Sequence, residues 1–205
     1  MEKVLVTGAT GYIALHCVQQ LLDKGYAVNG SIRSPERKNE IIDALKNSNT
    51  STENLNLFTF NLTSDDGWDA GMEGCDYVLH VASPLALENH TEDYFVKPAV
   101  EGAMRALNFA KKHNVKKVVL TSSVAAIFET GIEKVDYDEN DWSDPDNPKI
   151  SNYAKSKTLA EKAAWDFLDQ EDNPFEFAVI NPALVIGPSL SGDLGVSNFA
   201  IEMVV

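Results

Sequence analysis

The chain has 205 residues, of which 44% are hydrophobic, so it can bury one substantial core but hardly two. Its 31 acidic and 17 basic residues give a formal net charge of -14, and the basic residues are scattered along the chain. This charge argues against nucleic acid as a partner, and no apolar run reaches the roughly 18 to 20 residues needed to span a membrane.

Short apolar runs rich in β-branched residues alternate with longer helix-like stretches, a pattern typical of βαβ units that build a parallel sheet. In chain order we expect a strand at 3–7, a helix at 12–24, a strand at 26–32, a helix at 35–47, a strand at 55–60, a short helix near 65–72, a strand at 76–81, a helix at 93–113, a strand at 116–121, a helix at 152–170 and a strand at 175–181. Residues 129–150 are acidic and rich in turn residues, and we expect a long surface loop there. The order predicts an α/β fold, a doubly wound parallel sheet of Rossmann type.

A glycine-rich turn lies between the first predicted strand and the first predicted helix, in the segment Thr7-Gly8-Ala9-Thr10-Gly11. Gly8 permits a tight turn, and Gly11 lets the backbone approach a pyrophosphate at the positive end of the helix. Ala14 replaces the third glycine of the usual pattern. The alternative is an ordinary strand-to-helix turn with incidental glycines.

The end of the second predicted strand indicates which nicotinamide cofactor would bind. An NAD site places an acidic residue there to bind the ribose hydroxyls, whereas this sequence has Arg33, followed by Arg37 and Lys38. A guanidinium can pair with a 2′-phosphate, which predicts NADP(H). The alternative is an exposed cluster of cations at the start of a helix, where they oppose the helix dipole.

Tyr153 and Lys157 are four residues apart at the start of a predicted helix, so they project from the same face. A nearby ammonium stabilises a phenolate and makes proton donation by tyrosine easier near neutral pH. Ser123 follows a hydrophobic strand, at the end of a parallel sheet where ligands bind. Each of these features also occurs by chance. Here all three are present in one chain, first the glycine turn, then the serine and then the Tyr/Lys pair, and this combination argues against chance.

In these motifs the chain resembles the extended short-chain dehydrogenases and reductases, and within them the branch of dihydroflavonol, cinnamoyl-CoA and yeast-type aldehyde (methylglyoxal) reductases. The resemblance extends over essentially all 205 residues. It implies a catalytic triad of Ser123, Tyr153 and Lys157, in which Ser123 polarises a substrate carbonyl and Tyr153 protonates it. Lys157 would also hold the nicotinamide ribose.

The resemblance further implies a set of contacts with NADP(H). Asn61 stands where the family has an aspartate beside adenine, and its amide oxygen can still accept a hydrogen bond. Ile127 and Phe128 are apolar where a flavonoid reductase would be expected to offer a polar side chain, which favours a general aldehyde or ketone reductase. The predicted cofactor contacts are Thr7, Gly8, Thr10, Gly11, Tyr12, Ile13, Arg33, Lys38, Asn61, Leu62, Val81, Ala82, Ser83, Tyr153, Lys157, Pro182, Val185 and Ser197.

Family members usually run well beyond the length of this chain, which ends at residues 201–205 in what reads as an interrupted helix. We therefore expect residues 1–205 to form an NADP-binding Rossmann domain, in which residues 183–205 begin a largely absent, truncated substrate-binding part. Such a chain would bind NADPH yet reduce a small-molecule carbonyl substrate poorly. Two alternatives remain open: an NAD-dependent sugar-nucleotide epimerase or dehydratase, and a non-catalytic NADP-binding regulatory protein.

The cysteines, Cys17 and Cys75, form no CxxC pair and have no neighbouring histidine at metal-ligand spacing. We expect both to be reduced and buried, and we predict no metal site. The apolar run after Met1 is too short for a signal peptide. Together these features predict a soluble, cytoplasmic protein that binds no membrane, and they leave a homodimer open.

Overall fold

Strands and helices alternate along the chain, as the sequence predicts. The computed structural model describes residues 1–86, 90–130 and 134–202. Its strands are β1 (Lys3–Val6), β2 (Ala27–Ile32), β3 (Leu55–Thr59), β4 (Tyr77–His80), β5 (Lys117–Thr121) and β6 (Glu176–Ile180). Its helices are α1 (Tyr12–Asp23), the 3-10 turn η1 (Pro35–Arg37), α2 (Lys38–Asn47), α3 (Trp68–Met72), α4 (Glu92–Lys112), α5 (Ala125–Phe128), α6 (Asn152–Gln170) and α7 (Gly195–Glu202).

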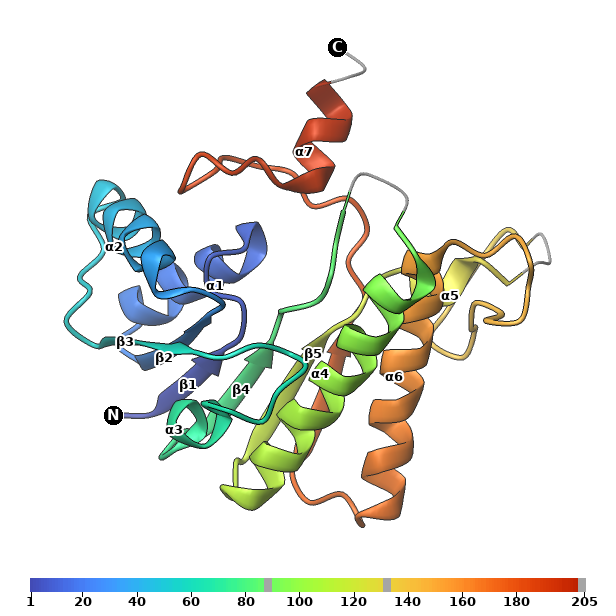
Figure 1. Cartoon of the computed structure of the whole chain (residues 1–205), viewed down its shortest axis with the longest axis horizontal. Coiled ribbons are helices and arrows are strands. Elements are labelled where there is room, and N and C mark those ends of the chain that lie inside the picture. Colours follow the sequence, from blue (N-terminus) through green and yellow to red (C-terminus); the bar gives the residue numbers. More distant parts are fainter. Residues whose placement is uncertain (87–89, 131–133, 203–205) are drawn as a thin grey trace.

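The strands form one six-stranded sheet in the order β3-β2-β1-β4-β5-β6 (Figure 1). Every neighbouring pair is parallel. The order reverses between β1 and β4, and in open sheets of this type ligands bind at that reversal, beyond the carboxyl ends of the strands. The predicted doubly wound Rossmann-type fold is confirmed.

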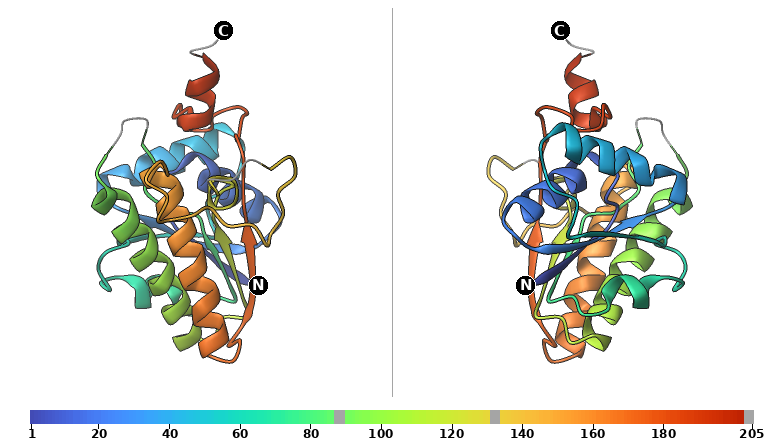
Figure 2. Two further views of the ribbon diagram at one scale, coloured as in Figure 1. Left: turned by 90° about the vertical axis from the view of Figure 1, so that its right-hand side faces the viewer. Right: turned by 90° about the vertical axis from the view of Figure 1, so that its left-hand side faces the viewer.

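Helices pack on both faces of the sheet (Figure 2). On one face α1 and α2 cover the β1–β3 half, and Leu15 and Ile41 are buried in the core between them and the strands. On the other face α3, α4 and α6 form a second core that includes Trp68, Leu107 and Leu168. The two helical layers hold the parallel strands in place. The loops that follow the carboxyl ends of the strands therefore lie at one end of the sheet.

The element ends differ from the predicted ones by only a few residues. The helix expected at 35–47 begins as η1 and continues as α2. Helix α5, which is only four residues long, was not predicted. Residues 129–150, where described, contain no helix or strand, and residues 131–133 lie outside the described residues. None of the described helices combines the length and the apolar character needed to cross a membrane.

Candidate active site

The turn after β1 has the geometry that a pyrophosphate-binding turn needs. Gly8 has a φ of 68°, and a Cβ at that position would lie 3.0 Å from the Cβ of Ala82. Gly11 is the N-cap of α1, and no side chain caps that end of the helix. The first amides of α1, which include those of Tyr12 and Ile13, therefore lie at the positive end of the helix dipole without a side-chain partner. The turn fits a phosphate-bearing ligand.

Thr7 supports this turn from within the fold. It is fully buried, and its hydroxyl accepts hydrogen bonds from the amides of Val81 and Ala82, each at 3.0 Å. The same oxygen lies 3.0 Å from Nδ1 of His80. Because a hydroxyl has one donor and two acceptor sites, it donates to Nδ1, and neutral His80 carries its proton on Nε2. The cofactor contact predicted for Thr7 would compete with these three bonds if it used the side chain.

The predicted 2′-phosphate site lies just beyond β2. Arg33 and Lys38 are exposed, and neither takes part in the ion pairs among the described residues. Arg37 instead pairs with Glu40, with 2.7 Å between Nη2 and Oε2. The hydrogen bonds that Arg37 donates to Glu40 raise the pKa of Arg37. Arg33 and Lys38 are thus available to an anion. The guanidinium of Arg37, which we expected to support them, is instead paired with Glu40.

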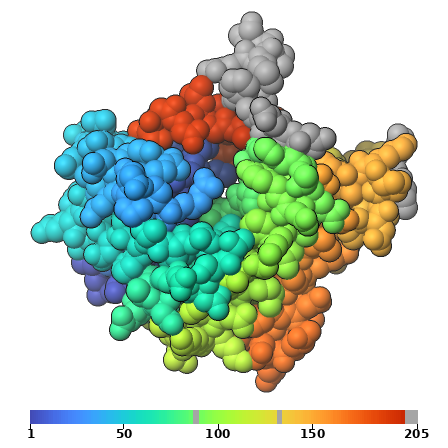
Figure 3. Space-filling view, in the orientation of Figure 1, coloured from blue at the N-terminus to red at the C-terminus, as the bar shows by residue number. Residues whose placement is uncertain are grey.

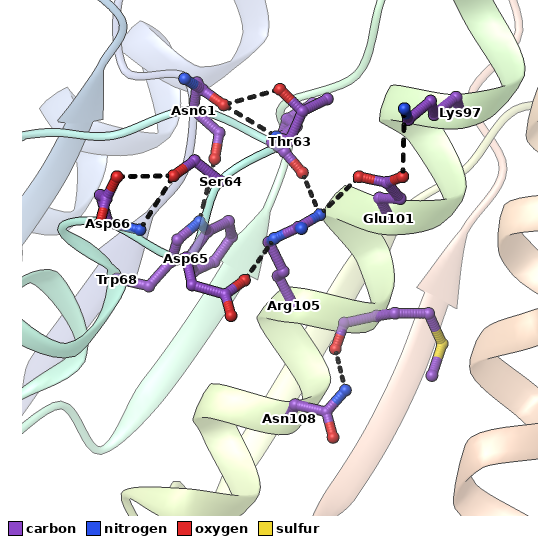
Figure 4. A network of polar contacts seen from close by, with 12 residues as sticks. Asn61, Thr63, Ser64, Asp65, Asp66, Trp68, Lys97, Glu101, Arg105 and Asn108 are labelled. Carbon is purple, nitrogen blue, oxygen red and sulfur yellow. Dashed lines mark hydrogen bonds and ion pairs between the residues drawn. The ribbon is translucent and has the colours of Figure 1, made fainter. Parts of the chain in front are cut away.

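The loop after β3 holds Asn61 in an arrangement that the sequence did not predict (Figure 4). The amide oxygen of Asn61 accepts from the backbone amide of Thr63 at 2.8 Å and from its hydroxyl at 3.0 Å. Both acceptor sites of this oxygen are therefore occupied, and the side chain is left with its NH₂ group as a donor. The acceptor role expected for Asn61 beside adenine is not available in this conformation.

Arg105 of α4 anchors the same loop (Figure 4). Its Nη1 donates to the carbonyl oxygen of Leu62 at 2.8 Å, and its Nε donates to Asp65 at 2.7 Å. Nη1 also reaches Glu101, one helical turn earlier, at 2.9 Å. A partly buried guanidinium with three partners fixes the loop geometry. Leu62, a predicted cofactor contact, thus owes its position to a helix distant in sequence.

Ser123 and Tyr153 meet at the carboxyl end of β5. Ser123 is 7% exposed, and its hydroxyl lies close enough to the phenol of Tyr153 to lower the pKa of that phenol. Burial raises the pKa of Tyr153 above its usual value, while the Ser123 hydroxyl lowers it by less. We expected Lys157 to lower the pKa of Tyr153, but in this structure the opposing contribution comes from Ser123. The two hydroxyls form the donor pair that a carbonyl oxygen would require.

Lys157 lies beneath this pair on the same face of α6. Its Nζ is 5.8 Å from the centre of the Tyr153 ring, and it donates to the carbonyl oxygen of Thr121 at 3.1 Å. The residue is only 6% exposed. Burial lowers the pKa of Lys157 to about 8, and Glu161 acts in the opposite direction. An ammonium held this way can stabilise negative charge on the phenol of Tyr153.

Tyr153 is the second residue of α6, so the hydrogen bonds at the start of this helix determine its position. Ser151 is the N-cap, and its hydroxyl accepts from the amide of Ala154 at 3.1 Å. The carboxylate of Glu129 in turn accepts from the amide of Ser151 at 2.9 Å and from its hydroxyl at 3.1 Å. Helix α6 therefore begins at a residue that is hydrogen-bonded to Glu129, which ends the segment that carries Ser123.

The remaining predicted contacts lie on the segments that leave the same end of the sheet. Val81, Ala82 and Ser83 directly follow β4. The carbonyl of Pro182 accepts from the amide of Val124 at 3.0 Å, which ties the segment after β6 to the Ser123 segment. This end of the molecule is hollowed between α2 (light blue), the start of α4 (green) and the carboxyl-terminal segment (red) in Figure 3. Val185 and Ser197 belong to that carboxyl-terminal segment and are half-buried.

Two polar residues beside the triad, the buried Glu161 and the half-buried Asn181, were missed in the sequence. Glu161 is 6% exposed, and Asn181 donates to its carboxylate at 2.9 Å. Glu161 lies four residues beyond Lys157, so the helical spacing was a usable signal. Asn181 is the last residue of the strand predicted at 175–181 and directly follows β6, and this place at the carboxyl end of a strand also pointed to the site.

Comparisons with known proteins agree with this picture. A sequence profile of the NAD dependent epimerase/dehydratase family matches residues 4–204. A cinnamoyl-CoA reductase from Medicago truncatula is 40% identical over 97% of this chain and 62% of its own length. A dihydroflavonol 4-reductase from Arabidopsis thaliana is 38% identical over 93% of this chain and 51% of its own length.

Solved structures give the same result. Vestitone reductase from alfalfa has a TM-score of 0.80 at 33% identity, over 96% of this chain and 61% of that one. Yeast methylglyoxal/isovaleraldehyde reductase Gre2, complexed with NADPH, has a TM-score of 0.79 at 31% identity, over 91% and 59%. The chain thus spans between 51% and 62% of the length of these relatives. Because the profile covers nearly the whole sequence, the chain belongs to the NAD dependent epimerase/dehydratase family, the extended short-chain dehydrogenases and reductases that its motifs resemble.

Proposed function

We propose that this chain is the cofactor-binding part of an NADPH-dependent reductase that converts an aldehyde or ketone to an alcohol. The observation that carries the proposal is the proximity of the Ser123 hydroxyl to the phenol of Tyr153, whose ring centre lies 5.8 Å from the buried ammonium of Lys157. Two neighbouring hydroxyl donors suit the oxygen of a carbonyl group. The relatives named above are all reductases, which supports the same reaction type.

NADPH, when bound, supplies the hydride for the carbonyl carbon. Ser123 donates a hydrogen bond to the carbonyl oxygen and polarises it. Tyr153 gives its phenolic proton to that oxygen as negative charge develops there. Lys157 compensates the charge left on the phenolate, because its ammonium lies beside the ring and is shielded from bulk water. The nicotinamide ribose is the group that we place against Lys157.

The choice of NADPH rests on Arg33. It follows β2, where NAD-binding folds carry an acidic residue, and its guanidinium is free of ion pairs with other described residues. Lys38 adds a second free cation nearby in the sequence. The relative Gre2 was solved as an NADPH complex, which supports the same choice. The free thiols of Cys17 and Cys75 fit the cytoplasmic location that we propose.

The proposal is tested by binding and turnover measured separately. Calorimetric titration of the chain with NADPH and NADH gives the cofactor preference. NADPH oxidation is then followed with aldehydes, ketones and diketones, for this chain and for a longer version that restores the length of the relatives. We expect tight NADPH binding by both, and full reduction rates only from the longer protein. Tyr153→Phe should abolish reduction in the longer protein and leave NADPH binding intact.

The possible outcomes separate this proposal from its rivals. The matching family profile is named for epimerases and dehydratases, so a sugar-nucleotide epimerase with retained NAD is a second candidate. A clear preference for NADH would favour it. Binding of NADPH without reduction of any carbonyl by either version would instead favour a regulatory protein. Reduction that survives Tyr153→Phe would disprove the assigned proton donor.

A further inference from the structure

Glu161 is a buried carboxylate that the proposed reaction does not use. Tyr153, Lys157 and Glu161 follow one another at intervals of four residues, so they lie along one face of α6. Glu161 is only 6% exposed. Glutamate is almost never buried to this extent unless it is paired. The groups around Glu161 should therefore include partners for its carboxylate.

The first partner of Glu161 is Asn181, just after β6. One amide group, Nδ2 of Asn181, donates to Oε2 of Glu161 at 2.9 Å and to the carbonyl oxygen of Ser123 at 3.1 Å. Both of its hydrogens are thus used. This bridge connects α6, which carries Tyr153, to the backbone of Ser123, whose hydroxyl lies close to the phenol of Tyr153. It holds α6 and the backbone of Ser123 together, and their relative position determines how the hydroxyls of Tyr153 and Ser123 are arranged.

Trp165 also donates from Nε1 to Oε1 of Glu161 at 3.5 Å, and Lys157 acts on the carboxylate across a small cavity. Lys157 and Glu161 form no direct ion pair, but both line a cavity of about 10 Å³, together with His80 and Ser122. The hydroxyl of Ser122 is buried without a hydrogen-bond partner. The volume is roughly what one water molecule needs, and the walls offer such a water several polar partners. Little bulk water separates the two groups, so the electrostatic interaction between the carboxylate and the ammonium is only weakly screened.

Glu161 is the only acidic side chain among the described residues that line this cavity. From β4, His80 faces the cavity in its neutral form, since burial and the nearby Lys157 lower its pKa to about 3. From α4, only the methyl groups of Ala99 and Ala103 line the cavity. The phenol of Tyr153 is the other titratable group beside Lys157. Among the described residues that line the cavity, Glu161 alone carries a negative charge that can balance the ammonium.

We propose that Glu161 is a positioning residue, which keeps Lys157 in its ammonium form and, through Asn181, holds the Ser123 segment against α6. This inference rests on the proposed function, because the ammonium matters to that reaction. A carboxylate at this place offsets part of the cost of burying Lys157. In its absence the lysine would lose its proton at a lower pH, and fewer molecules would carry the charge that Tyr153 needs.

The test is a direct titration of Lys157, which requires no turnover. The chain is labelled with ¹³C-lysine, the Lys157 signal is assigned with Lys157→Arg, and the shift of its side-chain carbon is followed against pH. Wild-type protein should titrate near pH 8. Glu161→Gln keeps an acceptor for Asn181 but loses the charge, and it should lower the midpoint by about 1 pH unit. Glu161→Asp keeps the charge and should restore most of that shift.

Asp166→Asn is the matched control, since Asp166 is an exposed acidic residue on the same helix. It should leave the midpoint unchanged. The inference is overturned if Glu161→Gln leaves the midpoint where it is, or if Asp166→Asn moves it as far. Should Glu161→Gln fail to fold, Glu161→Met, which also removes the charge, takes its place, and an unchanged midpoint in that variant overturns the inference. Failure of the proposed function would appear in the NADPH oxidation screen and would leave this titration readable.

Discussion

His80 should make the fold sensitive to acid in a way that a single substitution removes. The side chain is 3% exposed, and its Nδ1 accepts a hydrogen bond from Thr7. Burial first, and the charge of Lys157 second, lower its pKa from 6.5 to about 3. The perturbation is His80→Gln, which puts a neutral polar group in place of a titrating one.

The size of the effect follows from proton linkage. The unfolded chain binds a proton at His80 below about pH 6.5, while the folded chain does not until about pH 3, so the unfolded state gains as the pH falls. The contribution of His80 to stability is complete above about pH 6.5 and is lost progressively below it. At about pH 5 the loss is RT ln(1 + 10^1.5), or about 2 kcal/mol. The folded-state pKa hardly enters this figure, because it lies well below pH 5.

The assay is urea unfolding of wild type and His80→Gln at about pH 7.5 and about pH 5. Carboxylates whose pKa the fold lowers, such as Asp69 and Asp76, weaken both proteins in acid, so they cancel in the comparison. Wild type should lose about 2 kcal/mol more than the variant between the two pH values. Equal losses would refute the reasoning, because they would mean that His80 titrates alike in the folded and unfolded chains.

Four further predictions concern the turn, the core, the loop anchor and a thiol. Gly8→Ala places a side chain at a φ of 68° and 3.0 Å from the Cβ of Ala82, so it should cost about 1 to 3 kcal/mol of stability in urea unfolding and weaken NADPH binding. Trp68→Ala removes a fully buried ring and should cost about 3 to 5 kcal/mol in the same measurement. Arg105→Met releases the loop after β3, and calorimetry should show NADPH binding weaker by about 1 kcal/mol. Burial raises the pKa of Cys75 to about 11, so a thiol reagent near neutral pH should modify Cys75 far more slowly in the folded chain than in urea.

The sheet and its main helices could be predicted because their signals are local. A buried parallel strand is a short apolar run, and the helices that cover it repeat their apolar residues every turn. The spacing of Tyr153 and Lys157 is local in the same sense, since four residues make one helical turn. Helix α5 had no such signal, being only four residues long. The hydroxyl of Ser143, which accepts from Glu129 at 2.7 Å and donates to the carbonyl of Ala125 at 2.7 Å, links this helix to the long loop.

The polar contacts around the triad could not be predicted, because they join residues far apart in the chain. Thr7 and His80 are 73 residues apart, and Asn181 is 20 residues from Glu161. No periodicity encodes such pairs, which form only after the sheet has brought its strand ends together. The engagement of Asn61 by Thr63 is different, since an asparagine two residues before a threonine is a recognisable local turn.

The charge pattern at the triad explains why His80 has to stay neutral. His80 and Lys157 line one small cavity with the single carboxylate of Glu161. If both were cationic, Glu161 would face two buried positive charges and could balance only one of them. Burial and the charge of Lys157 prevent this outcome by lowering the pKa of His80, and the neutral ring can accept the hydroxyl of Thr7 at Nδ1. Lys157 is thus the one cation among the described residues that line the cavity, and the contact between Thr7 and His80 connects the wall of this cavity to the phosphate-binding turn.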